Sequence, residues 1–110
     1  EGELKNGSDW LSAINALHPT PAVGGVPSHE ALSFINQYEP FDRGWYAGPM
    51  GTITKSEAHI VVAIRSGDVI DNRVILAAGA GIVADSDADS EWDELNAKIN
   101  LFTSIFKDHA

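Results

Sequence analysis

The sequence contains no cysteine, which excludes disulfides, thiolate nucleophiles and cysteine-based zinc sites. It has no apolar run near the roughly 18 residues that a membrane-spanning helix needs, and no signal-peptide pattern. These absences predict a cytoplasmic protein that does not enter a membrane. The chain opens on EGELKNGSDW and its only methionine is Met50, so we expect further residues of the natural protein to precede it.

Basic residues are scarce, with 7 Lys and Arg against 16 Asp and Glu and a net charge of −9. This balance opposes binding to nucleic acids and to anionic membrane surfaces, and it suits a divalent cation held by carboxylates. A hydrophobic content of 44% in 110 residues predicts one globular domain, or part of one, and not a disordered chain.

Hydrophobic periodicity predicts three helices. The first runs from Ser8, as its N-terminal cap, to Leu17, and the prolines and glycines of HPTPAVGGVP end it. A second helix begins at residue 28 or 29 and ends near Tyr38, and a long third helix covers about 87–107. The apolar faces expected to be buried are Trp10, Leu11, Ile14 and Leu17; Leu32, Phe34, Ile35 and Tyr38; and Trp92, Leu95, Ile99, Phe102 and Phe106.

A central antiparallel hairpin is predicted between the second and third helices. Residues 58–70 read as one buried strand, apolar on both faces at 61–64. Asp71-Asn72 forms a two-residue turn, and residues 73–83 return as the partner strand. EPFDRGWYAGPMG precedes the hairpin as a turn leading into extended chain. Helices and an antiparallel sheet in this order define an α+β fold.

The stretch from Gly79 to Ala84 matches the G-x-G-x-x-A pattern of dinucleotide sites. That site requires a helix beginning within the glycines and a parallel strand–helix–strand unit. Here the glycines belong to a predicted antiparallel hairpin, and several carboxylates follow them. We therefore reject the dinucleotide interpretation. Two interpretations remain: Gly79 and Gly81 let a ligand approach the backbone closely, or they mark a bulge or a tight packing contact.

Glu91, Glu94 and Lys98 share one face of the third predicted helix, since they are three and four residues apart. They form either an ordinary solvated face with one ion pair, or a site for a hard cation such as Mg²⁺ with Lys98 beside it.

Four further residues are candidates for binding a ligand. Arg65 ends an apolar run, so its guanidinium either binds an acidic group or extends into water. Tyr46 lies between glycines, where its hydroxyl either reaches a ligand or only packs. His18 and Thr20 belong to the proline-rich turn, where a structural role is the alternative.

Five segments occur in an order that resembles the C-terminal part of the chorismate-utilising enzymes: LHPTPAVGG, EPFDRGWYAGPMG, VVAIRS, AAGAGIVADSD and EWDELNAK. The resemblance covers about residues 9–107. Within the family, the chain most resembles the isochorismate synthases of menaquinone or siderophore biosynthesis, because of EPFDRGWYAGP, Ser66 and Trp92. Salicylate synthase and anthranilate synthase component I are the alternatives within the family.

The resemblance implies roles for individual residues. The GAGIV segment would form the floor of the chorismate pocket and contact substrate through the backbone at Gly79 and Gly81. Arg65 and Tyr46 match residues that bind the enolpyruvyl carboxylate, and Lys98 matches a lysine that helps to hold a substrate carboxylate.

The remaining implied roles concern the metal and the rim of the pocket. Glu94 matches a ligand of Mg²⁺, and Glu91 matches a residue beside that ion. His18 and Thr20 match the turn at the edge of the pocket. The cofactor implied is Mg²⁺, and the ligands are chorismate and isochorismate.

The resemblance also implies that residues 1–110 are the C-terminal part of a chorismate-binding domain, in which an antiparallel sheet packs with helices. The family's general base, a lysine, and its general acid, a glutamate, lie N-terminal to LHPTP, so this chain contains no catalytic residue and is expected to be inactive alone. As a different class of function, a non-catalytic module that self-associates through exposed apolar surface is the alternative.

Overall fold

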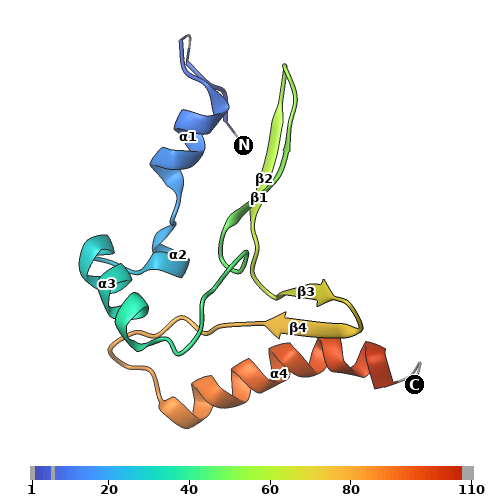
Figure 1. The fold of residues 1–110 in the computed structure, drawn as a ribbon. Helices are drawn as coiled ribbons and strands as arrows, with labels where there is room; N and C mark the ends of the chain where they lie inside the picture. Colours follow the sequence, from blue (N-terminus) through green and yellow to red (C-terminus); the bar gives the residue numbers. More distant parts are fainter. Residues whose placement is uncertain (1, 6, 108–110) are drawn as a thin grey trace. The chain divides into compact units, whose positions relative to one another are not determined.

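The computed structural model describes residues 2–5 and 7–107, with side chains as far as Ile105 at its C-terminal end. The chain divides into two compact units, Glu1–Ala63 and Ile64–Ala110. Each unit contains one antiparallel hairpin together with helical elements, which confirms the predicted α+β class (Figure 1).

The first helix, α1, covers Trp10–Leu17. Its N-terminal cap is Asp9 and not Ser8, so the predicted cap is wrong by one residue. The Asp9 carboxylate accepts hydrogen bonds from the Ser12 backbone N–H at 2.9 Å and from the Ser12 hydroxyl at 2.7 Å. A carboxylate in this position satisfies one of the unpaired N–H groups at the start of a helix.

The proline-rich segment ends α1 as predicted, but it also forms a short helix of its own. This helix, α2, covers Pro21–Gly24 with Thr20 as its cap. Proline at the first helical position is favourable because its fixed φ suits a helix and its missing N–H is not needed there. Helix α3 then covers Ser28–Tyr38, in agreement with the prediction.

The first hairpin pairs strand β1, Pro49–Ile53, with β2, Ala58–Val62. Two further bonds continue the ladder beyond β2, from the Ala47 N–H to the Ala63 carbonyl at 2.8 Å and from the Ala63 N–H to the Gly48 carbonyl at 2.9 Å. The pairing therefore ties the end of β2 to the segment that carries Tyr46.

The predicted single strand over 58–70 is wrong, because the chain breaks it at residues 63–65. Arg65 has a left-handed backbone with φ 49°, which a strand does not adopt. The residues after it form a separate strand, β3, at Ser66–Ile70. Neither strand is buried on both faces, and Val61 is 65% exposed. Each strand belongs to a two-stranded sheet, which has no central strand.

The second hairpin pairs β3 with β4, Arg73–Ala77, around the predicted turn at 71–72. Asp71 has a φ of 55°, the left-handed conformation that such a turn requires. Strand β4 ends at Ala77, so the prediction that it extends to residue 83 is wrong.

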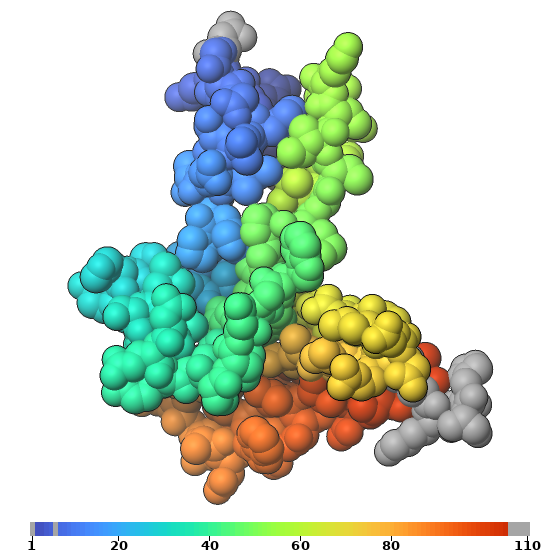
Figure 2. Space-filling view, in the orientation of Figure 1, coloured from blue at the N-terminus to red at the C-terminus, as the bar shows by residue number. Residues whose placement is uncertain are grey.

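The long helix, α4, covers Ala88–Lys107 and confirms the third predicted helix. Asp87 precedes it and accepts hydrogen bonds from the Ser90 N–H and hydroxyl, at 3.0 and 2.9 Å. Helix α4 lies along the β3–β4 hairpin and contacts β4 (Figures 1 and 2).

Little of the predicted apolar surface is buried. Among the residues described, the buried hydrophobic side chains are those of Ala47 and Ala63. The predicted buried faces are therefore wrong where they include exposed side chains, namely Leu11, Leu17, Phe34, Tyr38 and Trp92. Phe106 lies outside the described side chains. Along the part of the chain that is described, no helix combines the length and apolarity that crossing a bilayer requires.

Candidate functional site

The residues singled out from the sequence fall into two groups, one in each unit. His18, Thr20 and Tyr46 belong to the first unit. The second unit contains the other six: Arg65, Gly79, Gly81, Glu91, Glu94 and Lys98.

Lys98 is the centre of the group in the second unit. Its ammonium nitrogen lies 2.6 Å from Oε1 of Glu94, one turn earlier in α4. The same nitrogen donates to the Gly79 carbonyl at 3.0 Å. The Lys98 side chain is 24% exposed and that of Glu94 is 59% exposed. The structure thus brings together three of the predicted residues, and Lys98 links α4 to the segment that follows β4.

The contact with Lys98 changes the acidity of Glu94. A hydrogen bond from Lys98, reinforced by its positive charge, lowers the pKa of the Glu94 carboxyl group. Glu94 is therefore ionised under neutral conditions, as a metal ligand has to be.

Glu91 is held by a different partner. The Ser86 hydroxyl donates to Oε1 of Glu91 at 2.8 Å and accepts from the Val83 N–H at 3.1 Å. Ser86 was not predicted as a site residue, and its contact with Glu91 spans five residues, outside the three-residue spacing of a capping box.

The two glutamates fit part of a site for a hard cation. Carboxylate oxygens are the ligands that Mg²⁺ prefers, and Mg²⁺ commonly takes one or two of them together with substrate oxygens and water. Within the described residues no three His, Asp or Glu side chains gather to form a metal cage. Glu91 and Glu94 can therefore hold such an ion only with oxygens from elsewhere.

Gly81 and Arg65 are accessible positions in this unit. A Cβ atom added at Gly81 would meet no atom within 4 Å, so no tight packing contact explains this glycine among the described residues. The Arg65 side chain is exposed. The residue lies in the break between β2 and β3, where its backbone is left-handed.

The geometry also agrees with rejecting a dinucleotide site. Helix α4 begins at Ala88, beyond the glycines and beyond Ala84, and the preceding strands are antiparallel. Among the helices of the described residues, none begins at the G-x-G segment, as pyrophosphate binding would require.

His18 and Tyr46 line one pocket in the first unit, with a volume of about 270 Å³. The other residues that line it are Pro19, Val23, Leu32, Arg43, Gly44, Ala47 and Gly48. Thr20 is not among the lining residues; it precedes α2 as its cap, and its backbone carbonyl accepts bonds from the N–H groups of Val23 and Gly24. The structure therefore brings His18 and Tyr46 together, while Thr20 contributes its backbone carbonyl to α2 and its side chain forms no capping hydrogen bond.

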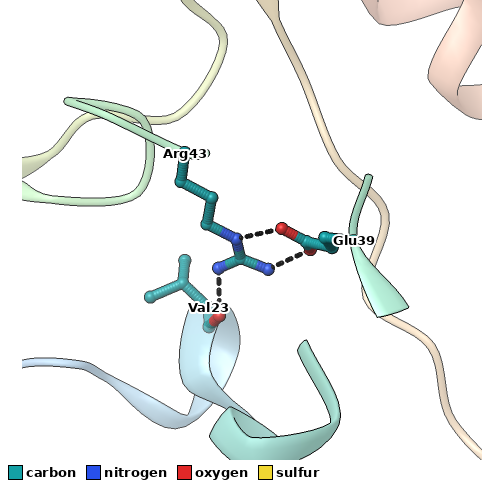
Figure 3. Close-up of polar contacts among 3 residues, drawn as sticks. All are labelled: Val23, Glu39 and Arg43. Carbon is teal, nitrogen blue, oxygen red and sulfur yellow. Dashed lines mark hydrogen bonds and ion pairs between the residues drawn. The ribbon is translucent and has the colours of Figure 1, made fainter. Parts of the chain in front are cut away.

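Arg43 was not predicted as a site residue, yet it has the most extensive polar contacts among the residues that line this pocket. Its Nε and Nη2 atoms donate to the two oxygens of Glu39, at 2.7 and 2.5 Å, and Nη1 donates to the Val23 carbonyl at 2.9 Å (Figure 3). The hydrogen bonds from Arg43 lower the pKa of Glu39, and the same contacts raise the pKa of Arg43. Helix α3 ends at Tyr38, so the Glu39–Arg43 pair forms beyond the helix, and its spacing of four residues did not predict it.

Comparison with known proteins identifies the class. The family described as chorismate binding enzyme matches residues 1–107, so the chain belongs to this family, and the resemblance found in the sequence is confirmed.

Similar proteins are isochorismate synthases. The chain is 48% identical over 103 residues to isochorismate synthase 2, chloroplastic, of Arabidopsis thaliana, covering 93% of this chain and 18% of that protein. It is 42% identical over 104 residues to isochorismate synthase MenF of Bacillus subtilis, covering 94% of this chain and 22% of that protein. It is 44% identical over 98 residues to the salicylate biosynthesis isochorismate synthase of Pseudomonas aeruginosa, covering 88% and 21%. The chain spans about a fifth of the length of the curated relatives it matches.

Proposed function

We propose that this chain is the substrate- and Mg²⁺-binding C-terminal portion of an isochorismate synthase, which converts chorismate to isochorismate. The observation that carries the proposal is the Lys98 contact network, in which one cation joins an acidic helix to the glycine segment. The similarity to isochorismate synthases supports the choice of reaction.

The charges of the second unit suit chorismate, which carries two carboxylates. Lys98 is a point charge, and Arg65 is a planar fork that binds a carboxylate through two parallel hydrogen bonds. The described contacts use two of the three donors of the Lys98 ammonium, so one remains to meet a substrate carboxylate. Open space at Gly81 lets substrate approach the backbone.

We assign Glu94 and Glu91 as the residues that hold Mg²⁺. Lys98 contacts Oε1 of Glu94, and the second carboxylate oxygen is the one we assign to the metal. Ser86 fixes the orientation of Glu91 on the same face of α4. The ion supplies positive charge that neutralises a substrate carboxylate inside an otherwise acidic site.

In the first unit, we assign His18, Thr20 and Tyr46 to the rim of the substrate site, with the Tyr46 hydroxyl donating to a carboxylate. These assignments rest on the resemblance together with the shared pocket of His18 and Tyr46.

The reaction adds one water molecule to the ring and releases the 4-hydroxyl group as another, so its net result is an isomerisation. A base has to deprotonate the incoming water and an acid has to protonate the leaving hydroxyl. We assign both roles to residues outside this chain, so the 110-residue chain alone should not turn over chorismate. The cytoplasmic location, and the choice between menaquinone and siderophore pathways, stay predictions.

Product analysis tests the proposal. The enzyme expressed from its complete gene is incubated with chorismate and Mg²⁺, without ammonia or glutamine, and the products are separated by liquid chromatography. Isochorismate as the sole product supports the proposal, whereas salicylate with pyruvate supports salicylate synthase. Conversion only after addition of ammonia supports an anthranilate-forming enzyme.

A second candidate function is self-association of the 110-residue chain. The observation that favours it is the exposure of large apolar side chains on both hairpins, including Val61, Val69 and Ile75. Two-stranded sheets also leave unpaired edges that a second copy can extend. Light scattering over a range of concentrations tests this candidate, and a monomer at high concentration would contradict it.

A further inference from the structure

We propose that Arg43 is a positioning residue for substrate binding, which holds the pocket of His18 and Tyr46 in shape by joining three segments of the first unit. The proposal deepens the proposed function and rests on it. Arg43 is not one of the predicted site residues, and its contacts indicate this role.

The three nitrogens of the Arg43 guanidinium reach two different segments. Two of them form the paired contact with Glu39, which is the C-terminal cap of α3. The third donates to the Val23 carbonyl in the last turn of α2, 20 residues away in the sequence. Carbonyls at the end of a helix lack partners within the helix, so this bond satisfies a group that would otherwise depend on water.

The third segment is the turn that carries Tyr46. The Tyr46 N–H donates to the Arg43 carbonyl at 2.8 Å, and the Gly44 N–H donates to the Asp42 carboxylate at 2.8 Å. The guanidinium carbon lies 6.0 Å from the centre of the Tyr46 ring. A change in the position of Arg43 is therefore transmitted to Tyr46 through the backbone.

The three contacts bear directly on the pocket. Val23, Arg43 and Tyr46 all line it, and α2 follows immediately after the turn that carries His18. Arg43 thus connects the two sides of the pocket from which His18 and Tyr46 come.

The charge of Arg43 is compensated by Glu39, and the two side chains are only 25% and 29% exposed. An arginine already committed to a carboxylate and a carbonyl has little capacity left to bind an anionic substrate directly. Its planar fork is what makes three simultaneous contacts possible, and a lysine ammonium cannot reproduce that geometry. Arg43→Lys is therefore the informative variant, since it keeps the charge and removes the fork.

The experiment uses the complete enzyme and chorismate. Arg43→Lys is compared with Arg73→Lys, the same replacement at an exposed arginine of β4, and each is combined with Tyr46→Phe. We expect Arg43→Lys to raise KM for chorismate on the order of tenfold, with kcat changed by less than about threefold, and Arg73→Lys to change neither. Because the two residues act through one contact network, Tyr46→Phe should raise KM less in the Arg43→Lys background than in the wild type.

Hydrogen exchange provides a readout that does not depend on turnover. In Arg43→Lys the backbone amide of Tyr46 should exchange faster, while Arg73→Lys leaves it unchanged. Unchanged KM and unchanged exchange in an active Arg43→Lys enzyme would overturn the inference and leave the proposed function standing. The inference would also be overturned if the KM increases caused by Arg43→Lys and by Tyr46→Phe simply multiplied in the double variant, as independent effects do. If the wild type does not consume chorismate, the proposed function fails, and so does the role of Arg43 in substrate binding. Faster exchange in Arg43→Lys would then show only that Arg43 stabilises the local structure.

Discussion

The Lys98 ammonium contacts the Glu94 carboxylate at 2.6 Å and the Gly79 carbonyl at 3.0 Å. The first contact follows from the helix, because residues four apart share a face. The second depends on the packing of α4 along the end of β4. Lys98 therefore orients the candidate metal ligand Glu94 and faces the segment assigned to the substrate.

Replacing Lys98 should weaken chorismate binding. Lys98→Met retains most of the aliphatic stem and removes the charge, so the bonds to Glu94 and to a substrate carboxylate are both lost. Hydrogen bonds to charged groups contribute about 1.5–3 kcal/mol, which predicts a rise in KM on the order of ten- to a hundredfold in the complete enzyme. Steady-state kinetics measures the change, and Lys55→Met, in the loop between β1 and β2, is the control. An unchanged KM would remove Lys98 from the substrate site.

Replacing Glu94 should weaken Mg²⁺ binding. Glu94→Gln keeps the shape of the side chain and removes the negative charge that a hard cation requires. We expect the Mg²⁺ concentration for half-maximal activity, and the Kd from calorimetry, to rise roughly tenfold or more.

Asp93→Asn is a matched control for Glu94→Gln, because it removes the same charge from a neighbouring position on a different face of α4. The difference between the two variants therefore isolates coordination from the general loss of negative charge. Equal effects of both variants on the Mg²⁺ Kd would contradict Glu94 as a ligand.

The Glu39–Arg43 pair should make stability depend on pH. The pKa of Glu39 is lowered below its ordinary value of 4.5 by the hydrogen bonds from Arg43. The pair therefore stabilises the folded chain above that ordinary value, and this contribution is lost as the pH falls through the lowered folded-state pKa. Glu39→Gln should lower the free energy of unfolding by about 1 kcal/mol at neutral pH, and the difference from the wild type should shrink in acid.

Urea unfolding of both proteins across the acidic range measures this difference, with Glu3→Gln as a control for the loss of one negative charge. A wild-type advantage that stays constant as the pH falls below 4.5 and through the acidic range would contradict the assignment of the effect to the Glu39 carboxylate.

Two glycines should respond differently to alanine. A Cβ at Gly81 would meet nothing within 4 Å, whereas a Cβ at Gly51 would collide with the His59 carbonyl oxygen across the β1–β2 hairpin. Gly81→Ala should therefore change the free energy of unfolding by less than about 0.5 kcal/mol, and Gly51→Ala should lower it by about 2 kcal/mol or more.

In the complete enzyme, Gly81→Ala should nevertheless raise KM for chorismate, because the methyl group occupies the space assigned to the ligand. Thermal unfolding and kinetics on the same preparations separate the two effects. A Gly81→Ala enzyme that is equally stable and has an unchanged KM would show that substrate does not approach this part of the backbone.

Local signals in the sequence predicted helices α1, α3 and α4 and the turn of the second hairpin. The positions of α1, α3 and α4 follow from apolar periodicity, and the turn after β3 follows from Asp71-Asn72. These features depend on residues within a few positions of one another, so an isolated sequence contains them.

The break at residues 63–65 could not be predicted in the same way. The hydrophobic pattern of a run such as 61–64 is the same whether the run lies inside one strand or joins the end of one strand to the start of the next. The left-handed conformation of Arg65 also has no local signal, because arginine has no special preference for positive φ.

The candidate site shows the same division. The pairing of Glu94 with Lys98 follows from helical spacing, whereas the bond from Lys98 to Gly79 crosses 19 positions and depends on packing. The contact between Arg43 and Val23 is likewise tertiary, so nothing in the spacing of those residues indicated it.

The most direct test of the proposed function is to identify the product that the complete enzyme forms from chorismate with Mg²⁺ present and ammonia absent. We expect isochorismate as the sole product, and we expect turnover to be lost when Mg²⁺ is removed by a chelator. Chorismate that stays intact until ammonia is added would contradict the proposed function, and would place the chain with the aminating branch of the family.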